Sequence, residues 1–358
     1  MTSQAITALA DMLSPHVPLG KTRLETLCLL IIGVISARTV NLSHVACERS
    51  GEVLIASTYR RLQRFFQHVA LGEDWSAGLV IRLLGLSGPW NLCLDRTNWK
   101  IGGRDVNILM LAVATRRFRV PLMWTVLDKA GNSNTQERVA LMQRYLALFG
   151  AESVRLLLAD REFIGLKWLN FLNGKNIPFA IRVKARLRVE TEDGRRLNLS
   201  SLLRKYRGAR KFYATFPGQG DVAALTLTFA ARRIRGGELL IVASNVADRN
   251  ILNAYRRRWA IECLFGDTKT RGLNLEDTRL QIASKLSLLL AIVSLAVVWA
   301  NRTASTLIGR GTLKRKTHGY YAKSWFRTGF DEIRRLLRSD PCAAVQPWSR
   351  ISIQRGVV

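Results

Sequence analysis

Trp90-Asn-Leu-Cys-Leu-Asp-Arg-Thr-Asn-Trp99 begins with a short apolar run that ends at Asp95, and Val154-Arg-Leu-Leu-Leu-Ala-Asp160 has the same form further along the chain. Each run has the length of a buried β-strand. An aspartate in such a place is usually a turn former or a helix cap. Strand ends that lie side by side would instead bring both carboxylates within reach of one cation, and hard cations such as Mg²⁺ prefer oxygen ligands.

The segments between the two runs predict how the strands are arranged. Strand-like segments at residues 106–113 and 120–127 follow the first run, and an expected helix ending at residue 148 precedes the second. A helix crossover that returns to a parallel strand is right-handed in nearly all proteins. The order strand, strand, strand, helix, strand is the ribonuclease H-like order, in which the first and fourth strands lie side by side. The predicted fold class is therefore α/β, with a ribonuclease H-like mixed sheet flanked by helices.

A β-rich insertion is predicted after this first part of the sheet. Residues 184–237 alternate strand-like segments with Gly-rich turns and many arginines. Residues 238–244 look like a strand that returns to the sheet, and Asp248 is expected to cap the helix that follows. Residues 1–85 are expected to be helical, because their apolar positions recur at helical spacing.

Charge points to a polyanionic partner. The 358 residues include 55 Lys and Arg but only 26 Asp and Glu, which gives a formal charge of +29. Nucleic acid is the leading partner, and an anionic membrane surface or a ribosome-like structural role is the alternative. In the expected helix at residues 57–67, Arg60, Arg61 and Arg64 either form a solvated face or grip DNA. The last part of the chain is also basic, with Lys314 to Lys316 beside His318, Tyr320 and Tyr321.

Cysteine and histidine usage limits the chemistry. The five cysteines show neither a disulfide framework nor the spacing of a zinc site, and the four histidines are scattered. We therefore expect a reducing compartment and a metal, if any, held by carboxylates. The apolar runs at residues 27–35 and 286–300 are shorter than the ~20 residues that a membrane span needs, so core helices are expected.

A third acid lies in a polar pattern after the insertion. Tyr255, Arg258, Glu262 and Lys269 follow one another at offsets of three, four and seven residues. On a helix these offsets fall within an arc of roughly 60°, so the four side chains would share one face. An ordinary solvated helix also shows charges at such spacing.

The full pattern resembles a known signature. Tyr, two residues, Arg, three residues, Glu, six residues, Lys is similar to the YREK signature of the bacterial insertion-sequence-four family of DDE transposases. Asp95-Arg-Thr-Asn-Trp99 and Ala159-Asp160-Arg-Glu-Phe163 resemble the first and second aspartate motifs of that family. The resemblance covers about residues 50 to 300. The long separation from Asp160 to Glu262 is similar to that of members with a β-strand insertion there.

The resemblance implies metal-dependent DNA cleavage (an endonuclease step) at insertion-sequence ends, followed by strand transfer into target DNA. Asp95, Asp160 and Glu262 are the implied catalytic residues and the ligands of two Mg²⁺ ions about 3.5–4 Å apart, with Mn²⁺ as an acceptable substitute. Tyr255 and its two basic partners are implied as DNA phosphate binders: Tyr255, Arg258 and Lys269.

The implied partners are double-stranded DNA, both element terminal repeats and target, and a second copy of the chain in a synaptic complex, with no membrane. The implied location is the bacterial cytoplasm, at the nucleoid. A hairpin intermediate would need an aromatic platform, but residues 184–237 contain no Trp, and we expect Trp99 and Trp259 to pack instead. The expected segments are a helical DNA-binding region (1–85), a ribonuclease H-like catalytic core in two parts (86–183 and 238–300), a β-rich insertion (184–237) and a basic C-terminal region (301–358).

Alternatives remain open at this point. A ribonuclease H-like nuclease could cut without joining strands, and a domesticated DNA-binding protein could keep the fold without activity. A membrane-surface protein is disfavoured because no long amphipathic basic helix dominates the chain. Among the other acids, Glu162 is expected to orient Arg161 and not to bind metal. The remaining four are expected to be turn, cap or surface residues: Asp105, Asp128, Glu137 and Asp267.

Overall fold

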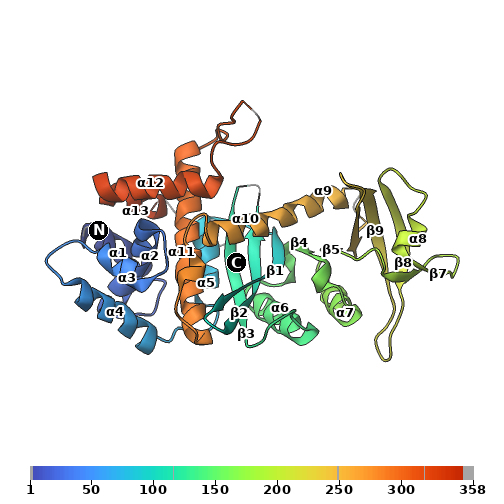
Figure 1. Ribbon diagram of the computed structural model, residues 1–358, viewed down its shortest axis with the longest axis horizontal. Coiled ribbons are helices and arrows are strands. Elements are labelled where there is room, and N and C mark those ends of the chain that lie inside the picture. Colours follow the sequence, from blue (N-terminus) through green and yellow to red (C-terminus); the bar gives the residue numbers. More distant parts are fainter. Residues whose placement is uncertain (1–2, 116, 248–249, 318, 350–358) are drawn as a thin grey trace.

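A computed structural model describes residues 3–115, 117–247, 250–317 and 319–349. Asp248, the predicted helix cap, and His318 lie outside the described residues. In this part of the chain one sheet of ten strands runs through the molecule, with helices gathered around one half of it (Figure 1). The strands across the sheet are β3 (Arg119–Leu127), β2 (Arg104–Ala114), β1 (Trp90–Ile101), β4 (Val154–Ala159), β5 (Phe179–Arg182), β10 (Leu239–Ser244), β9 (Leu225–Arg233), β8 (Arg210–Phe216), β6 (Arg188–Glu190) and β7 (Arg196–Asn198).

The first five strands confirm the predicted fold class. Strands β1, β2 and β3 form an antiparallel meander, and β1 pairs in parallel with β4, which pairs in parallel with β5. This is the order 3-2-1-4-5 of a ribonuclease H-like sheet. Leu94 of β1 is the register partner of Ala159 of β4, so the two predicted strand neighbours do lie side by side.

Strand β1 is longer than its apolar run predicts. The run ends at Leu94, and pairing with β4 ends there too. Pairing with β2 continues as far as Ile101, where Gly102, with φ of +61°, begins the turn of the hairpin. The expectation that Asp95 ends its strand is therefore wrong: Asp95 lies within β1, at the point where β1 loses β4 as a neighbour.

The β-rich segment extends the same sheet. Residues 184–237 form β6, β7, the short helix α8 (Leu199–Leu202), β8 and β9. Strand β9 pairs antiparallel with β10 over six residue pairs, from Leu239 opposite Arg233 to Ser244 opposite Thr228. Pairing is much weaker at the outer end of the sheet, where β6 and β8 are joined by the single residue pair Glu190 and Thr215. These strands form the right-hand end of the molecule in Figure 1.

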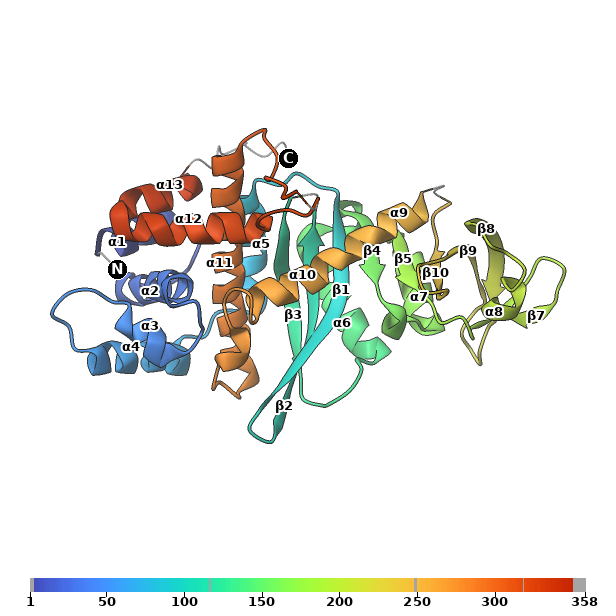
Figure 2. The same cartoon turned by 45° about the horizontal axis from the view of Figure 1, so that its top comes forward.

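Helices cover both faces of the core strands. Helix α10 crosses β1 to β3, whereas α6 and α7 lie against the opposite face (Figures 1 and 2). Asn134 caps α6 in a capping box with Glu137, which confirms that Glu137 is a cap residue. These helices and the short 3-10 turns near them are α6 (Thr135–Phe149), η1 (Ala151–Ser153), η2 (Arg161–Phe163), α7 (Leu166–Gly174), α9 (Ile251–Tyr255), η3 (Arg256–Arg258), α10 (Trp259–Thr268) and η4 (Leu275–Asp277).

The remaining helices gather beside β3. Helix α11 is long and apolar enough to cross a membrane, but 78% of its most apolar window is buried inside the protein, against β3, α2, α5 and α12. The predicted core helices at residues 27–35 and 286–300 are thus buried parts of α2 and α11. The helices of this group are α1 (Ser3–Leu13), α2 (Lys21–Ala37), α3 (Leu42–Cys47), α4 (Ile55–His68), α5 (Trp75–Leu84), α11 (Ala283–Ile308), α12 (Trp325–Ser339) and α13 (Pro341–Ser349).

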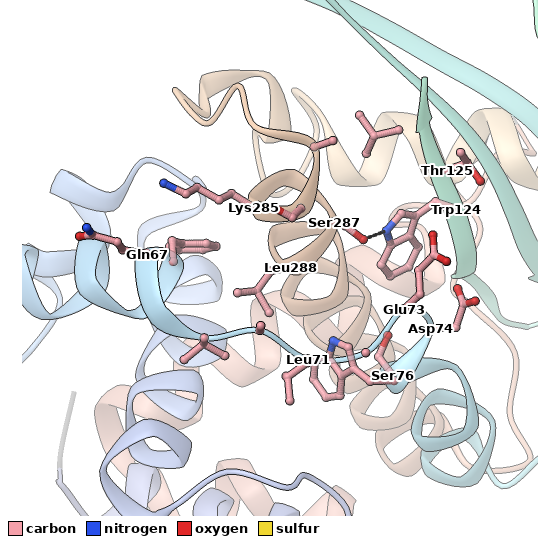
Figure 3. Close-up of a pocket in the computed structure, with 18 of the residues that line it drawn as sticks. Gln67, Leu71, Glu73, Asp74, Ser76, Trp124, Thr125, Lys285, Ser287 and Leu288 are labelled. Carbon is pink, nitrogen blue, oxygen red and sulfur yellow. Dashed lines mark hydrogen bonds between the residues drawn. The ribbon is translucent and has the colours of Figure 1, made fainter. Parts of the chain in front are cut away.

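A cavity of about 440 Å³ marks where the N-terminal helices meet the sheet. It lies between the α4–α5 connection, β3 and the start of α11 (Figure 3). The Trp124 indole donates a hydrogen bond to Ser287 Oγ at 2.8 Å on one wall, while Lys285 and Gln67 lie at the other end. None of the predicted site residues lines this cavity, so the cavity is separate from the predicted catalytic site.

Candidate active site

The two aspartates lie on neighbouring strands. Asp95 and Asp160 each follow by one residue the register partners Leu94 and Ala159, so they leave the parallel pair β1 and β4 at the same level. Asp160 stands at the N-terminus of η2 but makes no cap hydrogen bond. Its Oδ1 is buried and has no hydrogen-bond partner among the described residues. Buried polar atoms are normally paired, so this oxygen is available to a ligand.

Arg258 joins Asp95 to Glu262. Its guanidinium donates to Asp95 Oδ2 at 3.3 Å and also to Glu262 Oε1, one helical turn further along the chain. Arg258 and Asp95 are nearly buried, with 12% and 17% of their side chains exposed, whereas Glu262 is 36% exposed. The first and third predicted acids therefore share one cation supplied by the chain itself.

Burial sets the charge of Asp95. Loss of water raises the pKa of Asp95 to about 6, with smaller contributions from Glu162 and Asp160, while the Arg96 backbone N–H at 2.8 Å and the Arg258 guanidinium oppose the rise. At neutral pH this carboxyl is mostly ionised, and the positive group beside it is the Arg258 guanidinium.

The three carboxylates fit a hard cation in type, but they are not gathered around one point. Among the described residues, no three His, Cys, Asp or Glu side chains are close enough to hold a metal ion. Arg258 lies between Asp95 and Glu262, and among the oxygens of the three acids Asp160 Oδ1 is the one that is buried without a partner. A cation shared by all three would have to replace the Arg258 side chain, since two positive groups cannot occupy the same space.

The predicted single helix from Tyr255 to Lys269 is interrupted. Helix α9 ends at Tyr255, the three arginines of η3 follow in a tighter turn, and α10 ends at Thr268, so Lys269 is the residue after the helix. Arg256 and Arg257 are exposed, and Arg258 is held by its ion pairs with Asp95 and Glu262, so no apolar contact holds the wider α-helical turn there. The expectation that all four signature residues share one helical face is therefore wrong for Lys269.

Tyr255 fastens α9 to β4. Its hydroxyl donates to the Ala159 carbonyl oxygen at 3.3 Å, directly before Asp160. Burial of the side chain raises the pKa of Tyr255 above its usual range. The hydroxyl therefore points into the protein in this structure, and not toward solvent where DNA would lie.

Lys269 is tied to β1 and η4. Its ammonium donates to the Asn98 carbonyl oxygen at 3.3 Å, pairs with Glu276 at 2.7 Å and lies 5.5 Å from the centre of the Trp99 ring. Trp99 is buried, which confirms the expected packing role. Lys269 thus already has an acidic partner in the DNA-free protein.

Arg96 belongs to the site, although no sequence pattern singled it out. Its guanidinium pairs with Glu162 at 3.4 Å and donates to Asn107 at 3.1 Å. The expectation that Glu162 orients Arg161 is wrong, because Arg161 instead lies 4.0 Å from Glu238. The signal available in the sequence was the Arg that directly follows Asp95, whose reach to Glu162 depends on the β1–β4 neighbourhood.

Two further expectations are corrected by burial. Asp267 is buried beside Arg119, whose Nε lies 3.4 Å away, and burial raises its pKa to about 6, so it is not a turn or surface residue. Trp259 is 63% exposed and does not pack in the core. Helical spacing could not show this, because α10 is tilted across the sheet and the tilt decides which side faces solvent.

The mixed sheet with the core order β3-β2-β1-β4-β5, flanked by helices, is that of the ribonuclease H-like fold class. Residues 87–299, more than half of the chain, match the family described as transposase DDE domain. The protein therefore belongs to this family of DDE transposases.

A solved structure, described as the cryo-EM structure of the piggyBac transposase synaptic complex with hairpin DNA, is also similar to the chain. It is 11% identical in sequence, and the match covers 100% of this chain and 84% of that chain with a TM-score of 0.42. No curated protein matches the chain.

Proposed function

We propose that this transposase cleaves the ends of a bacterial insertion sequence and joins the freed 3′ ends to target DNA, as an insertion-sequence-four member with the YREK signature. The observation that carries the proposal is the placement of Asp95 and Asp160 one residue beyond the register partners Leu94 and Ala159, with Glu262 linked to Asp95 through Arg258. Carboxylates carried by two central strands and a crossing helix suit phosphoryl transfer on DNA once they close on the same ions.

Asp95, Asp160 and Glu262 would hold the divalent ions. Bound Mg²⁺ would activate the attacking water or 3′-hydroxyl and stabilise the leaving oxygen. The unpartnered Asp160 Oδ1 and the raised pKa of Asp95 support a site that gains stability when a cation arrives. Release of Arg258 from its two carboxylates is the rearrangement that this proposal requires of the chain.

Arg258 would then turn to a DNA phosphate. Its fork of N–H donors suits a phosphate as well as a carboxylate. Lys269 is proposed as a second phosphate binder once it leaves Glu276. Tyr255 has the same proposed role by resemblance, while its buried hydroxyl supports a positioning contact in the DNA-free protein.

The N-terminal helices would recognise the element ends. Helix α4 exposes Arg60, Gln63, Arg64 and Gln67 along one face, and these are residue types that bind base edges and phosphates. Arg61 faces inward and pairs with Glu25 at 3.5 Å.

We also propose that the protein forms a dimer on DNA and is located in the cytoplasm at the nucleoid. The five free cysteine thiols are consistent with a reducing compartment.

The test is cleavage of labelled DNA that carries the element's own ends, with Mg²⁺ or with EDTA, by the wild type and by Glu262→Gln. We expect Mg²⁺-dependent cutting that the variant loses while it still binds DNA. Glu332→Gln is the matched control, since Glu332 lies in α12 and pairs with Arg335. Cutting by Glu262→Gln at the wild-type rate would falsify the site.

Two other outcomes would favour the alternatives. Cleavage without any joined product, when target DNA is supplied, would indicate a nuclease. Binding of the ends without cleavage by the wild type would indicate a DNA-binding protein that has lost its activity.

A further inference from the structure

A basic groove lies beside the start of α10. This groove of about 420 Å³ is bounded by the β2–β3 turn, α10 and the connection from α11 to α12. Its charged lining side chains are Arg117, Arg119 and Arg310, and Arg119 also pairs with the buried Asp267 at 3.4 Å. Such a concentration of positive charge in a hollow attracts a polyanion.

Arg117 fixes the groove in place. Its guanidinium donates to the Gly309 carbonyl oxygen at 3.2 Å and lies 5.2 Å from the centre of the Trp325 ring. These contacts join the β2–β3 turn to the end of α11 and the start of α12. Arg117 is therefore held in place by the fold although its side chain is exposed, as that of Arg310 is.

The connection between α11 and α12, residues 309–324, adds cations and aromatic rings to the rim. We call it the basic loop; its sequence has no Asp or Glu, and it contains Lys314, Arg315 and Lys316. Arg315 lies 4.9 Å from the centre of the Tyr321 ring, and Tyr320 and Tyr321 are 75% and 52% exposed. Figure 1 shows the basic loop projecting from the molecule above α10.

The groove opens onto the helix that carries the third acid. Ala260 of α10 lines it, two residues before Glu262 and next to the exposed Trp259. A strand of DNA held in the groove would therefore run toward the same helix that contributes Glu262 to the site. This position distinguishes the groove from the many other arginines on the surface.

The chemistry of the groove suits the DNA backbone and not a particular base sequence. Arg and Lys bind phosphates, and exposed tyrosines stack on any base. The lining has no Asn or Gln, the side chains that read adenine, and no Asp or Glu that would read cytosine. Arginine can also read guanine, so the assignment to the DNA backbone rests on the exposed tyrosines and on the lack of Asn, Gln, Asp and Glu in the lining.

The geometry points to the groove and the basic loop as the track that holds target DNA during strand transfer. This inference rests on the proposed function, because only a joining reaction brings a second duplex to the site. Target DNA has no fixed sequence, so it needs contacts to the backbone. Element ends must be read by sequence and are assigned to α4 instead.

The test compares two sets of three exposed basic residues. The groove variant is Arg310→Ala with Lys314→Ala and Lys316→Ala, and the control is Arg155→Ala with Lys167→Ala and Lys175→Ala, on β4 and the α7 side of the sheet. Ends cut beforehand are offered with a plasmid, and joined products are counted. Cleavage of uncut ends and the salt dependence of binding to random duplex DNA are measured in parallel.

We expect strand transfer by the groove variant to fall about tenfold or more, with cleavage of the ends within about twofold of the wild type. Its log-log salt slope should be shallower by about 0.9 for each DNA phosphate that the groove no longer neutralises. The control should change neither the joining rate nor the slope by a comparable amount.

Two results would overturn the assignment. An equal loss of cleavage and joining would place the element end, and not the target, in the groove. Joining and a salt slope no different from those of the control would show that the groove does not contact DNA. The slope is measured without metal, so an unchanged slope counts against the groove even if the wild type cuts nothing, which is the separate failure of the proposed function.

Discussion

The Arg258 guanidinium donates to Asp95 on β1 at 3.3 Å and to Glu262 on α10, so a single side chain holds the first and third acids of the site. It supplies the positive charge that keeps two partly buried carboxylates together. The same contacts imply that metal binding and the position of Arg258 are linked.

Replacement of Arg258 should therefore make the fold depend on metal. Arg258→Ala leaves Asp95 and Glu262 without their common partner, and we expect a loss of about 1–3 kcal/mol in the free energy of unfolding in EDTA. Added Mg²⁺ should raise the melting temperature of the variant more than that of the wild type, because the ion no longer competes with a guanidinium.

Arg335→Ala is the control, since Arg335 pairs with Glu332 on the exposed face of α12. Equal Mg²⁺ shifts in the wild type and Arg258→Ala would contradict the competition between arginine and metal.

Tyr255→Phe should cost stability and leave DNA affinity nearly unchanged. The variant loses the hydrogen bond to the Ala159 carbonyl oxygen, which we expect to lower the free energy of unfolding by about 0.5–1.5 kcal/mol. Urea denaturation and fluorescence anisotropy with end DNA measure the two effects. A large fall in affinity without a change in stability would instead assign the hydroxyl to a phosphate.

Asp267 should make stability fall as the pH rises from about 4 to about 6. Burial raises the pKa of Asp267 to about 6 in the folded protein from its ordinary value of 3.8, so between these values the folded state binds more protons than the unfolded state. Stability then declines with rising pH, by an amount on the order of 1–3 kcal/mol for this group.

Denaturation midpoints between pH 4 and pH 7 test this, and Asp267→Asn should show a flatter dependence over that range. Asp95 contributes in the same direction, so the variant keeps part of the slope. A dependence as steep in Asp267→Asn as in the wild type would show that the buried carboxyl does not titrate there.

Arg64 and Arg61 form a matched pair on α4. Arg64 is exposed, whereas Arg61 pairs with Glu25 and donates to Thr26 Oγ1 at 2.7 Å. We expect Arg64→Ala to weaken binding to the element ends by about 1–3 kcal/mol if it contacts a base, and more than binding to random DNA. Arg61→Ala should act mainly on stability. Gel-shift titrations with element-end DNA and with random DNA measure these affinities. Equal effects of the two variants on binding to the element ends would contradict recognition of bases by this face of α4.

Sequence patterns were sufficient for the core of the fold. The apolar runs before Asp95 and Asp160 are long enough to mark buried strands, and the helix between them requires a parallel return. Together these rules place the two aspartates beside each other without any coordinate. The longest apolar helix was also predictable as a core helix, because burial of α11 follows from its composition.

The remaining features of the fold and the site depend on tertiary contacts, which the spacing of residues along the sequence does not reveal. The outer half of β1 is only partly buried, so its pairing with β2 left no apolar signal. The periodic pattern continues through η3 although the helix does not, because side-chain spacing changes little over one 3-10 turn. The tilt of α10 decides that Trp259 faces solvent, and only the folded chain brings Arg258 to Asp95.

The hydrogen-bonded pairing between β9 and β10 couples the protruding strands rigidly to the core sheet. Six consecutive residue pairs join them to the core sheet, two strands away from the one that precedes Asp160. A load applied to β8 or β9 is therefore transmitted through hydrogen bonds to the frame of the site, with no hinge between them. Freedom to move relative to the core sheet therefore begins beyond β8, where the ladder narrows to the single pair between β6 and β8.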